Sequence, residues 1–153
     1  MVVTGSVGGR VEIRHLQALL GEVPEELRKE LAKGTRSALA PLKKEIPAAE
    51  RVYMPTRYGA ILAGSTTVTN RVTTGDTLRA TVRVHAQGKS EARDVTALNR
   101  GILRHPRWGD RKHWYAQRVR PGIVDDPVEE ARKRVVANAE DARDRIADKI
   151  LRE

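Results

Sequence analysis

The spacing of apolar residues predicts a long helix in the first third of the chain. From Pro24 onward, apolar residues recur at steps that place them on one helical face, while charged residues occupy the other faces. The apolar positions are Leu27, Leu31, Ala38, Leu42 and Ile46. Because proline lacks a backbone donor and clashes with the preceding turn, we expect Pro41 to kink or interrupt this helix and Pro47 to end it.

A second amphipathic helix is predicted near the end of the chain. Asp126 suits an N-cap, Pro127 suits the first helical position, and Glu129 completes a capping-box pattern. The apolar stripe that follows is narrow and rich in alanine, with Val128, Ala131, Val135, Ala139, Ala142, Ile146 and Ile150 at steps of three or four. Such a stripe allows close approach to a sheet or to another helix. The charges on the other faces balance, so we assign those faces to solvent.

Alternating residues predict a short strand and a β-hairpin. Apolar and polar residues alternate from Arg10 to Arg14, and threonine and valine dominate residues 66–73 and 77–85. A hairpin loop of three or five residues keeps the valines on one face and pairs Val72 with Leu78, whereas a two-residue loop mixes apolar and charged groups on both faces. Since a shift of one residue exchanges the two faces, we expect the longer loop.

This register sets Arg71 directly opposite Arg79, with Arg83 and His85 further along the same polar face. Like charges opposed on a sheet are mildly destabilising. Three arrangements relieve the repulsion: the strands diverge, an anion lies over them, or the long side chains splay into water.

The remaining segments are predicted to be irregular. Residues 1–9 are rich in glycine, so we expect them to be flexible or to order against a neighbour. Residues 51–63 should form a loop leading into a short apolar segment, and residues 87–93 a flexible link. A long basic loop that contains both tryptophans should span residues 94–126. The expected fold is α+β, with residues 10–153 forming one domain whose small antiparallel sheet packs against the two helices.

Composition limits the core and the chemistry. The 153 residues suffice for one domain, but the chain has no phenylalanine and only 3% aromatic residues, so valine, leucine, isoleucine and alanine must fill its core. Such a core favours reliance on partner subunits for part of the stability. The absence of cysteine excludes disulfides and thiolate metal sites. No window is long and apolar enough to span a bilayer, so we expect a soluble, intracellular protein without a membrane partner.

Positive charge is concentrated in the middle of the chain. Residues 1–70 carry 10 basic and 7 acidic side chains, residues 71–120 carry 12 and 4, and residues 121–153 carry 7 and 9, giving net charges of +3, +8 and −2. A confined basic segment of this kind indicates a polyanionic partner, most simply nucleic acid, although solubility alone also accounts for it.

The candidates for catalysis or metal binding are His105, Asp110 and His113. Basic residues surround them, and no second acidic residue lies within ten positions of Asp110, which disfavours a cation site. The sequence also lacks a phosphate-binding Gly-x-x-x-x-Gly-Lys-Ser/Thr loop and a Gly-x-Ser-x-Gly nucleophile elbow. We therefore expect neither enzymatic activity nor a cofactor or metal.

Trp108 and Trp114 have two possible roles in a chain so poor in aromatic residues. They can supply the missing aromatic core, or they can lie exposed among arginines as a base-stacking platform or a protein interface. We favour contact with another subunit.

The order of these elements resembles that of the tail-completion, or head-to-tail joining, proteins of long-tailed double-stranded DNA bacteriophages, particularly those of phages of actinobacteria. The similarity covers about residues 10–151, and its most specific parts are Met54 to Ala63 and Leu98 to Val128. These include the motifs Pro-Thr-Arg-Tyr-Gly, from Pro55, and Asn-Arg-Gly-Ile-Leu-Arg-His-Pro-Arg-Trp-Gly, from Asn99.

The resemblance implies a structural protein of the virion, made in the host cytoplasm, that forms a ring of six copies at the neck. Its partners would be other copies of itself, the connector or stopper protein, the tail terminator or tail tube protein, and the genomic DNA passing through the ring. The arginines expected to face this DNA are Arg71, Arg79, Arg83, Arg100, Arg104 and Arg107. The residues expected at the subunit interface are Trp108, Trp114, Tyr115 and Arg118.

Two other hypotheses remain open at this stage. The same six arginines would serve a free nucleic-acid-binding module that needs no ring. A small nuclease would instead use His105, Asp110 and His113.

Overall fold

The structure, a computed structural model, describes residues 2–6, 10–16, 25–74, 78–87, 94–107 and 110–152. These residues form an α+β fold, as predicted, with a four-stranded and a two-stranded antiparallel sheet. The elements in chain order are β1 (Val2–Ser6), β2 (Arg10–Leu16), α1 (Glu25–Leu39), α2 (Leu42–Tyr53), α3 (Thr56–Ser65), β3 (Thr66–Thr74), β4 (Leu78–Ala86), α4 (Val95–Asn99), β5 (Ile102–Arg107), β6 (Asp110–Arg118) and α5 (Asp125–Ile150).

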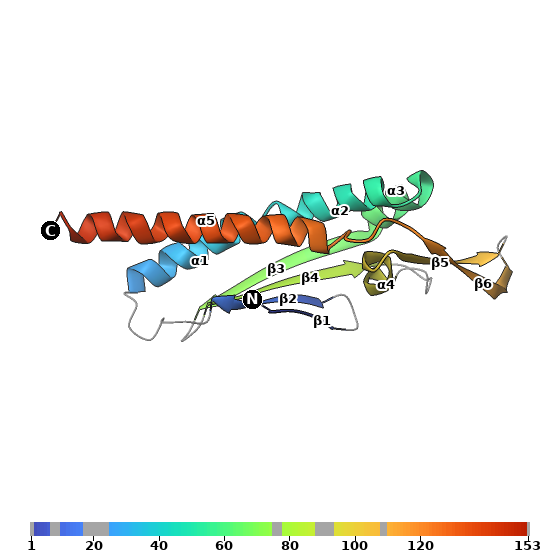
Figure 1. Cartoon of the computed structure of the whole chain (residues 1–153), viewed down its shortest axis with the longest axis horizontal. Coiled ribbons are helices and arrows are strands. Elements are labelled where there is room, and N and C mark those ends of the chain that lie inside the picture. The colour runs from blue at the N-terminus through green and yellow to red at the C-terminus, as the bar shows by residue number, and fades with distance from the viewer. Residues whose placement is uncertain are drawn as a thin grey trace.

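The larger sheet has the strand order β1-β2-β4-β3, and the long helices pack on one of its faces (Figure 1). The core lies between them and contains valine, leucine, isoleucine and alanine, with Met54 as the one other apolar type among the described buried residues. Tyr53 and Tyr58 only border it. This agrees with the prediction of a core poor in aromatic residues. The predicted strand at 10–14 is confirmed as β2, and β1 pairs with it from within the segment that we expected to be flexible.

Pro41 interrupts the predicted N-terminal helix, as expected, and separates α1 from α2. The prediction that Pro47 ends the helix is wrong, because α2 continues to Tyr53 with Pro47 inside it. Proline within a helix removes one hydrogen bond at a cost of about 3 kcal/mol. Burial of Leu42 and Ile46, both fully inaccessible to solvent, offsets this cost.

The loop predicted for residues 51–63 is also wrong. The end of α2 and most of α3 occupy this segment, and only Met54 and Pro55 separate the two helices. The helices pack closely because α3 presents Gly59 to α2: a Cβ atom at this position would lie 2.6 Å from the carbonyl oxygen of Glu50. The glycine that suggested a loop is therefore a packing residue.

The predicted hairpin is confirmed as β3 and β4, and its valines lie on the buried face. Its register differs by two residues from the prediction: Val72 pairs with Ala80, and Thr74 pairs with Leu78. Arg71 consequently lies opposite Thr81, and Arg79 lies opposite Thr73. The predicted opposition of Arg71 and Arg79 is wrong. A shift of two residues preserves the faces, so the hydrophobic pattern alone could not exclude it.

The C-terminal helix is confirmed, but its predicted cap is wrong. Helix α5 begins at Asp125, and the residue at its N-cap position, Val124, has no capping side chain. The carboxamide oxygen of Asn99 takes this role by accepting hydrogen bonds from the amides of Val124 at 2.9 Å and Asp125 at 3.2 Å. Asp126 is the second residue of the helix, and its side chain contacts Tyr53 and Arg120 instead.

Helix α5 runs along α1, with their directions opposed. The close approach is possible because Gly34 of α1 faces Asn138 of α5, whose carboxamide donates a 2.9 Å hydrogen bond to the Gly34 carbonyl. Arg134 donates to Glu45 of α2, and Lys149 pairs with Glu26 near the start of α1. The assignment of every charged face of α5 to solvent is thus wrong for Arg134, which is half-buried against α1 and α2.

The long basic loop predicted for residues 94–126 is wrong as well. Most of this segment forms α4 and the two-stranded sheet of β5 and β6. The strands were missed because only Leu103 among their described residues is buried, so no apolar alternation marks them.

Candidate functional site

One face of the hairpin formed by β3 and β4 is basic and exposed. Arg71 from β3 and Arg79, Arg83 and His85 from β4 are all exposed on the face opposite the buried valines. Exposed threonines separate them. We call Arg71, Arg79, Arg83 and His85 the basic sheet face. The structure thus brings together three of the six arginines predicted to face DNA.

Strand β2 pairs with β4 alongside the basic sheet face. The Cα of Arg10 pairs with that of Arg83, while Glu12 pairs with Thr81 in the next row. Sequence reasoning did not foresee this pairing, because it joins segments about 70 residues apart.

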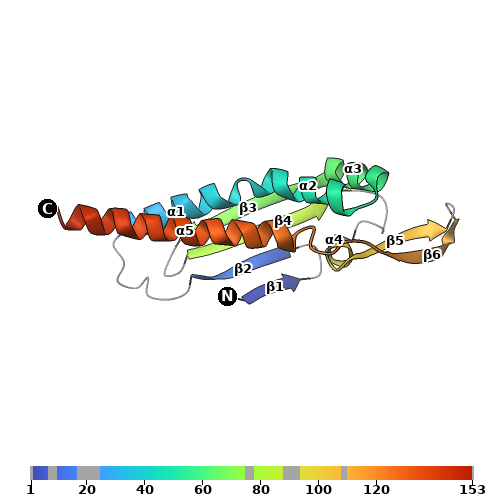
Figure 2. The same cartoon turned by 45° about the horizontal axis from the view of Figure 1, so that its top comes forward.

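The two-stranded sheet projects from the body of the protein. Figures 1 and 2 show β5 and β6 extending beyond the end of the four-stranded sheet, at the end of the molecule opposite the C terminus of α5. We call residues 102–118 the arm. Its root is anchored by three core residues, Leu98 of α4, Leu103 of β5 and Ile123, each at most 3% exposed. An isolated two-stranded hairpin is marginally stable in water, so the arm depends on this anchor.

Two glycines set the direction of the arm at its root. Gly101 and Gly122 have positive φ angles of 81° and 89°, which side-chain-bearing residues rarely adopt. Backbone hydrogen bonds join the two ends of the arm: the Val119 amide donates to the Gly101 carbonyl at 3.0 Å, and the Gly122 amide donates to the Asn99 carbonyl at 2.9 Å. These hydrogen bonds hold the first and last residues of the arm side by side where it joins the body of the protein.

A polar cluster beside the root connects the arm to the helices. The hydroxyl of Tyr53 on α2 donates a 2.7 Å hydrogen bond to Asp126 of α5, and the Arg120 guanidinium lies 3.8 Å from the centre of the Tyr53 ring. Arg120 is also 3.6 Å from the Asp126 carboxylate. The hydrogen bond to Asp126 raises the pKa of Tyr53.

The strand register divides the arm into two faces. Ile102 pairs with Arg118, Arg104 pairs with Ala116, and Pro106 pairs with Trp114, so these residues share one face. Lys112 lies on the same face of β6 by alternation. On the other face, His105 pairs with Tyr115, and their ring centres are 6.3 Å apart.

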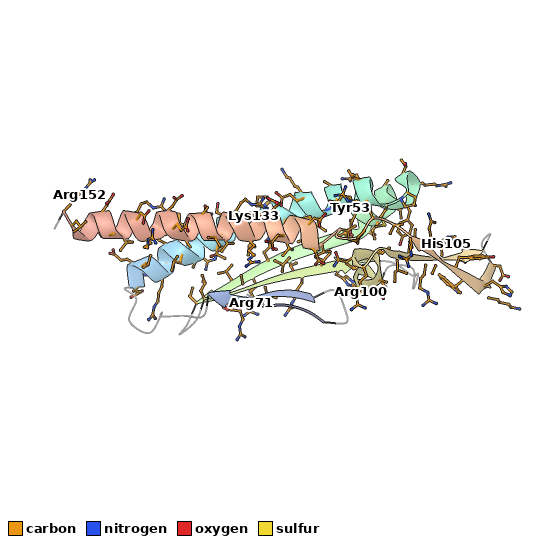
Figure 3. All side chains as sticks on the ribbon, in the orientation of Figure 1. Tyr53, Arg71, Arg100, His105, Lys133 and Arg152 are labelled. Carbon is orange, nitrogen blue, oxygen red and sulfur yellow. The ribbon has the colours of Figure 1, made fainter. Side chains whose placement is uncertain are left out.

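The other three predicted DNA-facing arginines lie on the arm or at its root. Arg100 ends α4, and Arg104 is exposed on β5. Arg107 ends β5, with its side chain outside the described part of the structure. Figure 3 shows Arg71 and Arg100 on the side of the molecule away from α5. The six arginines thus form two groups, one on the sheet and one on the arm.

The predicted interface residues are divided between the arm's faces. Trp114 is half-buried and shares a face with Arg118, whereas Tyr115, which is 45% exposed, lies on the opposite face. Trp108 lies outside the described residues. Neither Trp114 nor Tyr115 belongs to the hydrophobic core cluster, so the arm displays aromatic residues that the core lacks.

The three residues considered for catalysis or metal binding, His105, Asp110 and His113, do not come together in one pocket. Nδ1 of His113 lies 2.7 Å from Oδ2 of Asp110, but both side chains are at least half exposed. Hydrogen bonds from His113 and from the Lys112 amide lower the pKa of Asp110. His105 instead lies against Tyr115, with Nδ1 3.3 Å from the Pro106 carbonyl oxygen. Within the described residues, no three His, Cys, Asp or Glu side chains are placed to hold a metal ion.

One buried ionisable group was missed by sequence reasoning. Glu50 of α2 is fully inaccessible to solvent, and its Oε1 accepts a 2.7 Å hydrogen bond from the Thr66 hydroxyl. Its Oε2 has no partner among the described residues. Burial raises the pKa of Glu50 to about 7. The signal in the sequence was its position four residues after Ile46, on the apolar face of the helix.

Comparisons with known proteins add no family assignment. No protein-family model matches the chain, and no similar protein was found among curated proteins or solved structures. In the described part of the chain, no helix is long and apolar enough to cross a membrane.

Proposed function

We propose that this protein is a structural subunit of the neck of a long-tailed bacteriophage, where copies form a ring at the head-tail junction through which DNA passes. The proposal assigns it to tail completion or head-to-tail joining, without enzymatic activity. The observation that carries it is the separation of surfaces: helices cover the apolar side of the sheet, while the other side of the β3–β4 hairpin is exposed and basic.

The basic sheet face suits contact with a passing duplex. Arg71, Arg79 and Arg83 are exposed, and none forms an ion pair within 4.0 Å with another described residue. Phosphate contacts of this kind need no base recognition, because the charge of the DNA backbone is independent of sequence. Exposed threonines between the arginines keep the surface polar without adding acidic repulsion.

The arm suits contact with another protein. It exposes Ile102 at 42% and Tyr115 at 45% on a hairpin that projects from the body. Aromatic, aliphatic and arginine side chains together are typical of the residues that dominate protein interfaces. A closed ring in which each copy holds two neighbours would add the stability that an aromatic-poor core lacks.

Sedimentation velocity of the purified protein, alone and mixed with isolated phage tails, tests the proposal. A ring subunit sediments as a discrete oligomer alone or joins the tail fraction in a fixed ratio. A protein that remains monomeric at every concentration, and never moves with tails or connectors, contradicts the proposed function.

The alternative is a nucleic-acid-binding module, which the clustering of three arginines on one exposed face also favours. Such a module binds free DNA with an affinity that falls steeply with added salt. A channel must let DNA slide, so we expect the neck protein to bind free DNA weakly.

Titration of fluorescent duplex DNA at several salt concentrations separates these functions. For the module, replacing Arg71, Arg79 and Arg83 with alanine lowers the slope of log affinity against log salt by up to about 3, if each arginine contacts one phosphate. For the neck protein, the wild type already binds weakly, and the replacement leaves assembly with tails unchanged.

A further inference from the structure

Three cations without an ion-pair partner among the described residues lie on the arm, at one end of the molecule. On the arm, Arg104, Lys112 and Arg118 are exposed, and none forms an ion pair within 4.0 Å with another described residue. The single acidic residue of the arm, Asp110, already contacts His113 through its carboxylate. The register and strand alternation place all three cations on the same face, together with Ile102 and Trp114. We call these five residues the basic arm face.

The second half of α5 carries three acidic residues without an ion-pair partner, while its cations Arg143 and Arg145 pair with Asp144 and with Glu30 of α1. Glu140, Asp141 and Asp148 are exposed, and none forms an ion pair within 4.0 Å with a described residue. The acidic residues near the start of α5 differ, since Glu129 and Glu130 pair with Arg132 and Lys133. Apart from Asp125 at its first position, the acidic residues of α5 that lack an ion-pair partner among the described residues lie in its C-terminal half.

The same outer surface of α5 also offers apolar contact area. Ala137, Asp141, Asp144 and Asp148 are spaced by three, four or seven residues and lie on one helical face. Val136, which is 49% exposed, borders this face, and Ala147 is exposed nearby. We call residues 136–148 the acidic helix face. Ala137 and Ala147 beside the acidic residues leave room for a flat hairpin to approach the helix.

The two faces cannot meet within one copy. The arm projects from one end of the elongated molecule, and the C-terminal half of α5 lies at the other end (Figures 1 and 2). A contact between them must join two copies, and it uses a different surface on each partner. Contacts of this heterologous kind produce rings when the rotation between copies closes.

We infer that the basic arm face of one copy docks on the acidic helix face of the next copy. The inference rests on the proposed ring, and it identifies which surfaces form the contact. Electrostatic attraction sets the orientation, because Arg104, Lys112 and Arg118 meet carboxylates that have no other ion-pair partner among the described residues. Ile102 and Trp114 supply the apolar part of the interface, opposite the small residues of α5.

Charge reversal in two complementary variants tests the contact. The arm variant carries R104E, K112E and R118E, and the helix variant carries E140K, D141K and D148K. Each variant alone opposes like charges at every interface, so we expect the dissociation constant for self-association to rise at least about tenfold. An equimolar mixture restores opposite charges at every contact when the variants alternate around a ring with an even number of copies, so the mixture should assemble.

A matched control reverses three cations elsewhere. The variant K43E, K44E and R57E makes the same change in net charge as the arm variant, on exposed positions of α2 and α3. We expect it to assemble like the wild type. Circular dichroism confirms that each variant is folded before its association is measured by sedimentation velocity.

The outcomes separate this inference from the proposed function. If the wild type assembles and the arm or helix variant assembles equally well, the docking surfaces are wrong while the ring stands. A mixture of two folded variants that stays dissociated also contradicts the docking. A wild type that assembles neither alone nor on isolated tails contradicts the proposed function, and the docking inference is lost with it.

Discussion

Arg134 of α5 donates two parallel hydrogen bonds to Glu45 of α2, from Nη1 to Oε1 at 3.0 Å and from Nη2 to Oε2 at 2.8 Å. Nε of the same guanidinium donates to the Ala38 carbonyl at the end of α1, at 3.2 Å. One side chain thus joins three helices at the interruption that Pro41 creates. Both partners are about one third exposed, so the pair is less screened than the surface pairs of α5.

This geometry predicts measurable coupling between Glu45 and Arg134. We expect a double-mutant cycle with Glu45→Ala and Arg134→Ala, followed by urea unfolding, to give an interaction free energy of about 1 kcal/mol. Arg134→Ala should cost more than Glu45→Ala, because it also removes the bond to Ala38. The same cycle on the exposed pair Glu130 and Lys133 should give a value near zero. Equal coupling in the two cycles would contradict the role assigned to Arg134.

The packing of α2 on α3 predicts opposite effects for two glycines of one helix. Gly59→Ala places a methyl group 2.6 Å from a backbone oxygen, so we expect a loss of about 1–3 kcal/mol in the free energy of unfolding. Gly64→Ala meets no atom within 4 Å and should be neutral or stabilising by up to about 1 kcal/mol, because alanine favours helix. Thermal unfolding of both variants measures the difference. Similar melting temperatures would show that the helices are not in close contact.

The burial of Glu50 predicts a stability that falls as the pH rises. Its pKa is about 7 in the folded protein and about 4.5 in an ordinary environment, so between these values the folded state holds a proton that the unfolded chain has released. The free energy of unfolding therefore decreases through this window, by about 3 kcal/mol at most. Glu50→Gln, which mimics the protonated carboxyl group, should remove this dependence and make the protein more stable than the wild type at pH 8.

The control for this prediction is Glu140→Gln, which changes an exposed carboxylate to the same amide. Urea unfolding at pH 5 and pH 8 should show the wild-type dependence in the control and a flatter profile in Glu50→Gln. Parallel pH profiles for all three proteins would mean that Glu50 does not titrate in this range.

The cap that Asn99 provides to α5 predicts a second stability effect. Asn99→Ala removes the acceptor for the Val124 and Asp125 amides, and we expect a loss of about 0.5–2 kcal/mol in the free energy of unfolding. Asn99→Asp keeps an acceptor oxygen at a helix N terminus and should remain close to the wild type. If alanine and aspartate prove equally disruptive in chemical unfolding, the side chain does not act as a cap.

Sequence reasoning succeeded where burial on one face sets the pattern. The periodic apolar positions of α5 and the alternation in β3 and β4 predicted these elements, because each packs one face into the core. It failed at Gly59 and Pro47, where long-range packing overrides a local signal that ordinarily ends or interrupts a helix. The register of the hairpin was wrong by two residues because that shift leaves the buried face unchanged.

The candidate site was only partly predictable. Arg71, Arg79 and Arg83 were assigned to one polar face, and the structure confirms that face. The arm was mistaken for a loop, since Leu103 is its one buried residue among those described and its strands show no apolar alternation. The cap at Asn99 could not be foreseen either, because it depends on bringing the two ends of the arm together.

Electron microscopy of wild-type protein bound to isolated phage tails tests the central claim most directly. We predict class averages with a ring of rotational symmetry at the end of the tail tube and an open channel along its axis. Tails without an added ring at their ends, together with single copies of the protein free in the background, would contradict the account.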